Sequence, residues 1–127
     1  MELIVVVVIT GILAALALPQ YNKSKEHSLG LEAQANLKLI AAAEKVYRME
    51  RNTYIPEANI AGINYDLKLS MPSSSSRNWD YSVNPAAAST FTATATRLSG
   101  PYCPASCCQY TINQIQDDAQ LFGGTCP

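Results

Sequence analysis

The chain has 127 residues, of which 9 are basic and 10 are acidic, so its formal net charge is −1. This balance excludes the basic surface typical of nucleic-acid-binding proteins and the long acidic tail of a charged interaction segment. The length fits one domain, and the apolar residues, which make up 48% of the chain, are concentrated near its N-terminal end.

The first predicted element is an apolar helix over residues 1–20. Residues 3–18 contain only two positions that are not aliphatic, Thr10 and Gly11. A helix over residues 1–18 measures about 27 Å at 1.5 Å per residue, close to the ~30 Å hydrocarbon core of a bilayer. A secretory signal peptide begins with positive charge, whereas the first lysine here is Lys23. The segment therefore has the length of a membrane anchor without the charge pattern of a discarded signal.

Three residues in this segment do not suit a plain membrane anchor. Gly11 and Pro19 weaken a helix, because glycine costs about 1 kcal/mol relative to alanine and proline removes a backbone donor and clashes with the preceding turn. Glu2 is costly in apolar surroundings unless a cation lies beside it. In a bundle of helices that cation would belong to a neighbouring chain. We therefore expect residues 1–20 to lie first in a membrane and later in the core of a protein filament.

The second predicted element is the amphipathic half of the same helix, over residues 21–52. Its apolar residues recur every three or four positions, at Leu29, Ala33, Leu37, Ile40, Ala43 and Tyr47. Charged residues, Glu44 among them, are expected to lie mainly outside this face. The two halves predict one helix of about 75 Å at 1.5 Å per residue, bent near Pro19 and ending near Asn52. His27, the only histidine, is expected to be an exposed helix residue without a metal-binding or catalytic role.

Residues 53–127 are expected to form a globular head that begins with a connecting loop. Alternation of apolar and polar residues then predicts short strands over residues 64–70, 78–83 and 90–98, and a weaker one over 109–115. A helix followed by a meander of strands is typical of an α+β fold. We predict an antiparallel β-sheet packed on the C-terminal half of the long helix.

The four cysteines lie near the C-terminus, at Cys103, Cys107, Cys108 and Cys126. An even number in a polar region rich in serine and threonine predicts disulfides formed in an oxidising compartment. The adjacent Cys107 and Cys108 are not expected to pair with each other, because the geometry is strained. One of them is expected to pair with Cys103 and the other with Cys126. Zinc is disfavoured because the spacing is not the usual pair of C-x-x-C units, and no cofactor is predicted.

The stretch ELIVVVVITGILAALALPQYNKS resembles the N-terminal signature of type IV pilins and of the pseudopilins of type II secretion systems. The likeness lies in the spacing of Glu2, Gly11 and Pro19 within a long apolar run that has a polar exit. It implies a long N-terminal helix, a connecting loop, an antiparallel sheet and a cysteine-closed C-terminal region. It also implies cleavage by a prepilin peptidase, an N-methylated mature N-terminus and Glu2 as the fifth mature residue, with the leader and the first three mature residues preceding Met1.

The sequence contains no Gly-rich phosphate loop, nucleophile elbow or catalytic pairing of its histidine, so we predict that the protein is not an enzyme. The resemblance implies a pilin, most similar to major pilins, that passes from the inner membrane into an extracellular type IV pilus of identical subunits. Its expected partners are the assembly machinery and the prepilin peptidase, and its expected roles are adhesion, motility or uptake. In the family's pattern Glu2 neutralises the N-terminal amine of an adjacent subunit, and the helix loosens between Gly11 and Pro19 in the fibre.

Two alternatives stay open. The first is a type II secretion pseudopilin that forms a short periplasmic pseudopilus. Those related to the major pseudopilin usually carry a calcium site in the C-terminal loop, whereas Asp117 and Asp118 are the only acidic residues after Asp80 here. The second is a membrane-anchored extracytoplasmic binding protein, which would use residues 1–20 as a plain anchor and would not need Glu2.

Overall fold

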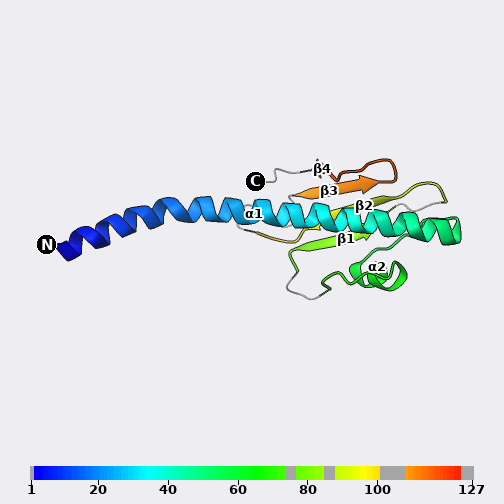
Figure 1. The fold of residues 1–127 in the computed structure, drawn as a ribbon, viewed down its shortest axis with the longest axis horizontal. Coiled ribbons are helices and arrows are strands. Elements are labelled where there is room, and N and C mark those ends of the chain that lie inside the picture. Colours follow the sequence, from blue (N-terminus) through cyan, green and yellow to red (C-terminus); the bar gives the residue numbers. More distant parts are fainter. Residues whose placement is uncertain (1, 74–76, 85–87, 101–107, 124–127) are drawn as a thin grey trace.

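The computed structural model describes residues 2–73, 77–84, 88–100 and 108–123. Its elements in chain order are α1 (Glu2–Arg51), α2 (Ile60–Asp66), β1 (Trp79–Val83), β2 (Thr92–Arg97), β3 (Gln109–Asn113) and β4 (Gln120–Gly123). The strands form one antiparallel sheet in the order β1-β2-β3-β4. The sheet lies beside the C-terminal half of α1, while the N-terminal half projects away from it (Figure 1). This arrangement confirms the predicted α+β fold.

Helix α1 is one continuous helix of 50 residues that passes through Gly11 and Pro19. Its N-terminal part curves gently (Figure 1). The helix ends at Arg51, one residue before the expected position. There Asn52 adopts a left-handed conformation with a φ of 58°, and its N–H still donates to the Arg48 carbonyl at 2.8 Å. Asparagine tolerates this conformation better than most residues, which explains why the helix stops at this point.

The face of α1 that meets the sheet is the one that the sequence predicts. Ala33, Leu37 and Ile40 are completely buried, and the other predicted members of the face are half-buried. Glu44 is also completely buried, which corrects the expectation that charged residues lie mainly outside this face. It follows Ile40 by four residues, so the helical spacing that buries the apolar residues places this carboxyl among them.

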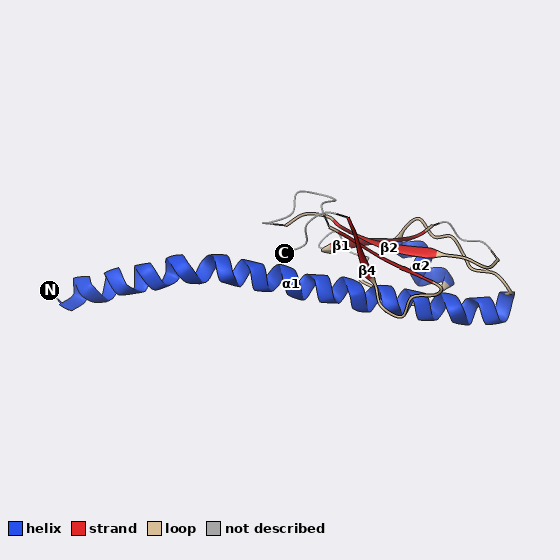
Figure 2. Cartoon of the chain, turned by 90° about the horizontal axis from the view of Figure 1, so that it is seen from above, coloured by secondary structure: helices blue, strands red, loops and turns tan. Residues whose placement is uncertain are grey.

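The sheet packs on α1 through the alternating residues of its strands. In β1 the buried residues are Trp79, Tyr81 and Val83. The residues opposite Tyr81 and Val83 in β2 are alanines, and both are completely buried. Small side chains in β2 let α1 approach the middle of the sheet, and α1 packs against β2 and β3. Figure 2 shows the strands along one side of the C-terminal half of α1.

Three of the four predicted strands are confirmed. Residues 78–83, 90–98 and 109–115 correspond to β1, β2 and β3, whereas β4 was not predicted. The fourth strand pairs with β3, and its register with β3 shifts between Gln109 and Tyr110.

The predicted strand over residues 64–70 is wrong, because residues 64–66 are the last turn of α2 and residues 67–70 form no strand. The Asn59 side chain caps the helix by accepting a hydrogen bond from the Gly62 N–H at 2.9 Å. Ile60 and Ile63, three residues apart, are buried. This helical spacing outweighs the alternation that suggested a strand, so the segment expected to be a connecting loop contains a short helix packed against β1.

Candidate functional site

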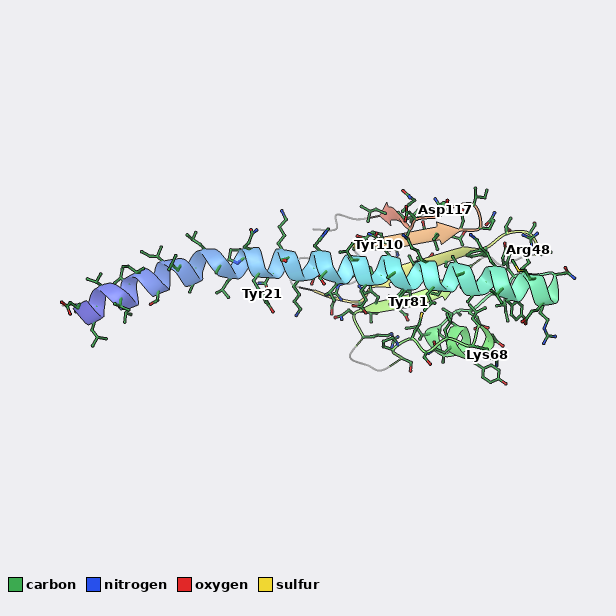
Figure 3. The ribbon with its side chains drawn as sticks, in the orientation of Figure 1. Tyr21, Arg48, Lys68, Tyr81, Tyr110 and Asp117 are labelled. Carbon is green, nitrogen blue, oxygen red and sulfur yellow. The ribbon has the colours of Figure 1, made fainter. Side chains whose placement is uncertain are left out.

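The most unusual surface of the molecule is the N-terminal part of α1. The large aliphatic side chains between Leu3 and Leu18 are 52% to 79% exposed. Figure 3 shows side chains extending in all directions from this part of the helix, which no other described segment covers, whereas beyond Tyr21 the helix meets the sheet. The segment is long and apolar enough to cross a membrane, and none of it is buried within the chain. An apolar surface of this extent marks a region that a lipid or a protein covers.

The one polar side chain within the apolar run satisfies its own hydrogen bond. The Thr10 hydroxyl lies 2.8 Å from the Val6 carbonyl and 3.0 Å from the Val7 carbonyl, to which it donates. This back-bonding to the preceding turn is the usual solution for a hydroxyl that faces apolar surroundings. Thr10 therefore does not oppose the transfer of the segment into lipid or into a helix bundle.

The structure places the three predicted assembly residues on one helix without bringing them together. Glu2 lies in the first turn of α1, and Pro19 lies inside the helix, about 26 Å further along at 1.5 Å per residue. A methyl group at Gly11 would find no atom of the chain within 4 Å. Packing within the described part of the chain therefore does not require glycine at this position.

The point where α1 reaches the head is held by a buried ion pair that the sequence analysis missed. The Glu26 carboxylate accepts from Arg97 Nε at 3.2 Å and from Arg97 Nη2 at 3.0 Å. Both side chains are 4% exposed. Arg97 Nη1 also donates to the Asn78 carbonyl at 2.7 Å. The signal in the sequence was present, because Arg97 continues the inward-facing positions of Ala93 and Ala95 in β2.

A second buried carboxyl lies at the other end of the head. Glu44 accepts a hydrogen bond from the Ile55 N–H through Oε2 at 3.2 Å, and its Oε1 has no partner among the described residues. Burial raises the pKa of Glu44 to about 7, against the lowering effect of that hydrogen bond. Burial and a hydrogen bond with Asp66 also raise the pKa of the nearby Glu57. Burial therefore makes Glu44 bind its proton more tightly in the folded chain than in the unfolded chain.

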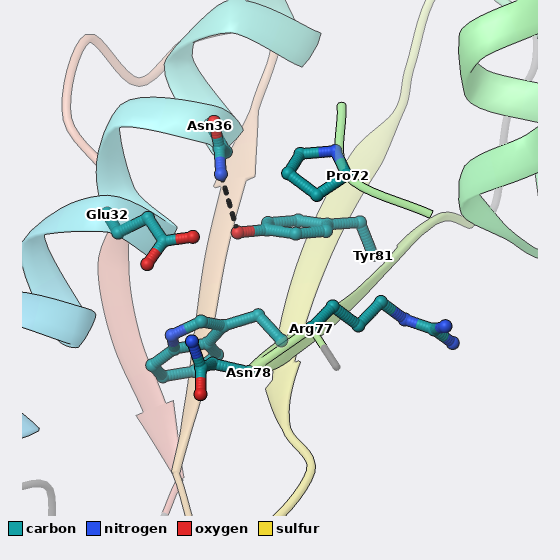
Figure 4. A pocket seen from close by; sticks show the side chains of 7 residues that line it. Glu32, Asn36, Pro72, Arg77, Asn78 and Tyr81 are labelled. Atoms are coloured by element: carbon teal, nitrogen blue, oxygen red, sulfur yellow. Dashed lines mark hydrogen bonds between the residues drawn. The ribbon is translucent and has the colours of Figure 1, made fainter. Parts of the chain in front are cut away.

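A small crevice of about 140 Å³ lies between α1 and the start of β1. Figure 4 shows its lining, in which Asn36 donates to the Tyr81 hydroxyl, at 2.9 Å. Burial raises the pKa of Tyr81 to about 12, so this tyrosine is a neutral structural group rather than a base. Within the described residues, no cluster of three or more histidine, cysteine or acidic side chains could hold a metal ion.

The predicted cysteines and histidine are placed as follows. Cys108 is buried and disulfide-bonded, while Cys103, Cys107 and Cys126 lie outside the described residues. His27 is an exposed residue of α1. The exposed apolar segment is therefore the principal candidate for function.

Comparison with known proteins gives one informative match. Over 61 residues, the chain is 43% identical to the type IV major pilin protein PilA of Myxococcus xanthus (strain DK1622). Over this stretch the chain is similar to a type IV major pilin. The match covers 48% of this chain and 28% of the length of that pilin. No protein-family model matches the chain.

This match confirms the resemblance to pilins that the N-terminal signature indicates. The long N-terminal helix with an antiparallel sheet on its second half is consistent with it.

Proposed function

We propose that the chain is a pilin, the structural subunit that polymerises into an extracellular type IV pilus. The observation that carries this proposal is the uncovered apolar segment Leu3–Leu18 projecting from a folded head, together with the similarity to a major pilin. Residues 1–20 anchor the subunit in the inner membrane and then form the filament core. Residues 21–52 hold the head on the same helix, and residues 53–127 form the head, closed at its C-terminal end by disulfides.

The physical basis of assembly is an exchange of apolar environments. A segment that moves from lipid to a bundle of similar helices keeps its aliphatic surface out of water, so the hydrophobic contribution changes little. Apolar contacts alone do not fix how far one helix slides along the next. A polar pair inside the bundle does fix it, because a mismatched register leaves a buried charge without its partner.

Glu2 is the residue that supplies this register. In the filament core its carboxylate is surrounded by the aliphatic side chains that follow it in α1, so it requires a cation from another subunit. We propose the N-terminal amine of an adjacent subunit as that cation. Each subunit then uses one surface to bind the subunit on one side and a different surface to bind the next, and contacts of this kind that do not close produce a helical filament.

The stretch between Gly11 and Pro19 allows the helix to adapt to its neighbours. Proline removes one hydrogen bond of the helix, and glycine has the greatest backbone freedom. We propose that this stretch loosens in the assembled fibre, although it is helical in the single chain. The prepilin peptidase and the pilus assembly machinery are the proposed partners before and during assembly, and adhesion, motility or uptake is the proposed role of the fibre.

Electron microscopy of cells that produce the chain tests the proposal. The wild-type chain should form long surface filaments in which it is the main component. Glu2→Ala should strongly reduce the number and length of these filaments, whereas Glu50→Ala, at an exposed position near the end of α1, should leave them unchanged.

Other outcomes would point to the alternatives. No surface filaments, combined with a secretion defect on deletion of the chain, would favour a pseudopilin. Wild-type filament number and length in the Glu2→Ala variant would contradict the role of Glu2.

A further inference from the structure

The head first covers α1 at Glu26. From residue 2 to residue 25, every described side chain is exposed except the half-buried Asn22. Glu26 is 6% exposed, and it is followed on the same face by the buried Gly30 and Ala33. Glu26 therefore marks the boundary between the free part of α1 and the part held by the sheet.

At this boundary the contact is polar and directional. Two oxygens of Glu26 accept two N–H groups of Arg97, at 3.2 Å and 3.0 Å, and this paired geometry restricts the angle between the two groups. Arg97 is fixed in turn by its bond to the Asn78 carbonyl and by the Trp79 ring, whose centroid lies 5.8 Å from the guanidinium carbon. The pair thus connects α1 to the start of β1 and the end of β2.

The backbone at Gly100 lies so close to the pair that a methyl group added there would clash with it. A methyl group at Gly100 would lie 2.5 Å from Glu26 Oε1 and 2.8 Å from Arg97 Nη2. Both distances are shorter than a non-bonded carbon contact permits, so a methyl group at Gly100 would displace the charged ends of the pair. Gly100 therefore lies directly against the pair.

We propose that Glu26 and Arg97 are positioning residues that fix where, and in which direction, the free part of α1 leaves the head. The next contacts along the helix are apolar or small: Gly30 against the Tyr110 ring, and then Ala33. If the pair is lost, the first fixed point moves four to seven residues along α1, or about 6–10 Å at 1.5 Å per residue. The remaining contacts, which are the apolar ones and the Asn36–Tyr81 hydrogen bond, hold the helix on the sheet further along α1 and permit its free part to tilt.

The consequence for assembly rests on the proposed function. The free part of α1 extends about 36 Å from Glu26 to its N-terminal end at 1.5 Å per residue. A tilt of about 10° at the boundary would displace that end by about 6 Å, which is more than half the usual 8–10 Å separation of packed helices. The pair therefore determines whether the apolar segment meets its neighbours when the heads are in contact.

The test measures the direction of the helix in the single chain. Spin labels are attached through a keto amino acid, which leaves the disulfides intact, at Ala14 in the free part of α1 and at Tyr65 in α2. Tyr65 is 74% exposed and belongs to the helix that lies beside the last turns of α1. The two labels are roughly 50 Å apart along the helix, and pulsed electron paramagnetic resonance on the full chain in detergent micelles gives the distribution of distances between them.

Two variants alter the pair in different ways. Gly100→Ala keeps both charges but forces them apart. The double variant Glu26→Leu/Arg97→Met replaces the pair with apolar side chains of similar volume, which need not lower stability. Leu98 N–H still donates to the Asn78 carbonyl in this variant. We expect the wild-type chain to give one narrow distance distribution, and each variant to broaden or shift it while thermal unfolding shows that the head is folded.

Lys38→Gln is the matched control. It removes another ion pair between α1 and the head, with Asp118, but that pair is exposed and should have little effect on direction. A wild-type distance distribution in either folded variant of the Glu26–Arg97 pair would overturn the proposal, and so would equal broadening in Lys38→Gln. The result is independent of filament formation, because it is measured on monomers. If the wild-type chain forms no filaments in cells, the proposed function fails while the positioning role stands or falls on the distances.

Discussion

Glu44→Gln provides the sharpest test of the head's electrostatics. Glu44 is completely buried, and burial raises its pKa from the ordinary 4.5 to about 7. A rise of this size corresponds to about 3 kcal/mol, at about 1.4 kcal/mol per pKa unit. The folded chain binds this proton more tightly than the unfolded chain does. The contribution of Glu44 to stability is therefore complete below pH 4.5, is lost as the pH rises to about 7, and is constant above that.

The glutamine variant removes this titration while keeping the shape of the side chain. Its amide oxygen can still accept the Ile55 N–H, as Glu44 Oε2 does in the wild-type chain. The wild-type chain and Glu44→Gln should therefore have similar free energies of unfolding at pH 4.5. At pH 8 the variant should be more stable by up to about 3 kcal/mol, because only the wild-type chain must then hold a buried charge or take up a proton.

Denaturant unfolding of the full chain in detergent micelles measures this difference. Trp79, the only tryptophan, is 2% exposed, so its fluorescence reports unfolding of the head. The exposed Glu32 provides the control, and Glu32→Gln should follow the wild-type pH profile. The reasoning is refuted if the stability difference between Glu44→Gln and the wild-type chain is the same at pH 4.5 and pH 8.

Two further predictions concern stability. Leu37→Ala should lower the free energy of unfolding by about 2–5 kcal/mol because it opens a cavity at a completely buried position. Leu39→Ala, at a position that is 46% exposed, should cost less than about 1 kcal/mol in the same denaturant titration. Equal losses in the two variants would contradict the assigned helix face. Cys108→Ser should lower stability by about 2–5 kcal/mol through loss of its disulfide. A reducing agent opens every disulfide of the chain, so it should destabilise the wild-type chain at least as much. An unchanged unfolding midpoint in both cases would show that this bridge does not stabilise the head.

Much of this fold could be predicted because two periodic patterns are unambiguous. The spacing of Ala33, Leu37 and Ile40 identifies the helix face without reference to the rest of the chain. The alternation in β1 and β2 does the same for the sheet, since Tyr81 and Val83 are separated by one polar residue. Both patterns are local, and the structure buries the residues that they select.

The features that the sequence did not predict depend on contacts with other parts of the chain, and a local pattern of apolar and polar residues does not reveal such contacts. Helix α2 has seven residues, too short a stretch for periodicity to separate it from a strand. Strand β4 carries two exposed apolar residues, Leu121 and Phe122, and it exists because β3 offers an edge for pairing. The Glu26–Arg97 pair joins residues 71 positions apart. Each of its members is visible as a charge in an inward-facing position, but only the folded sheet brings them together.

The three glutamates Glu2, Glu26 and Glu44 show how one residue type meets three environments along α1. A carboxyl removed from water needs either a cation or a proton. Glu26 has its cation within the chain, at Arg97, and Glu44 retains a proton up to about neutral pH. None of the ion pairs in the described part of the chain involves Glu2. In the proposed filament its carboxylate is covered and needs a cation, and we propose the N-terminal amine of an adjacent subunit for this role.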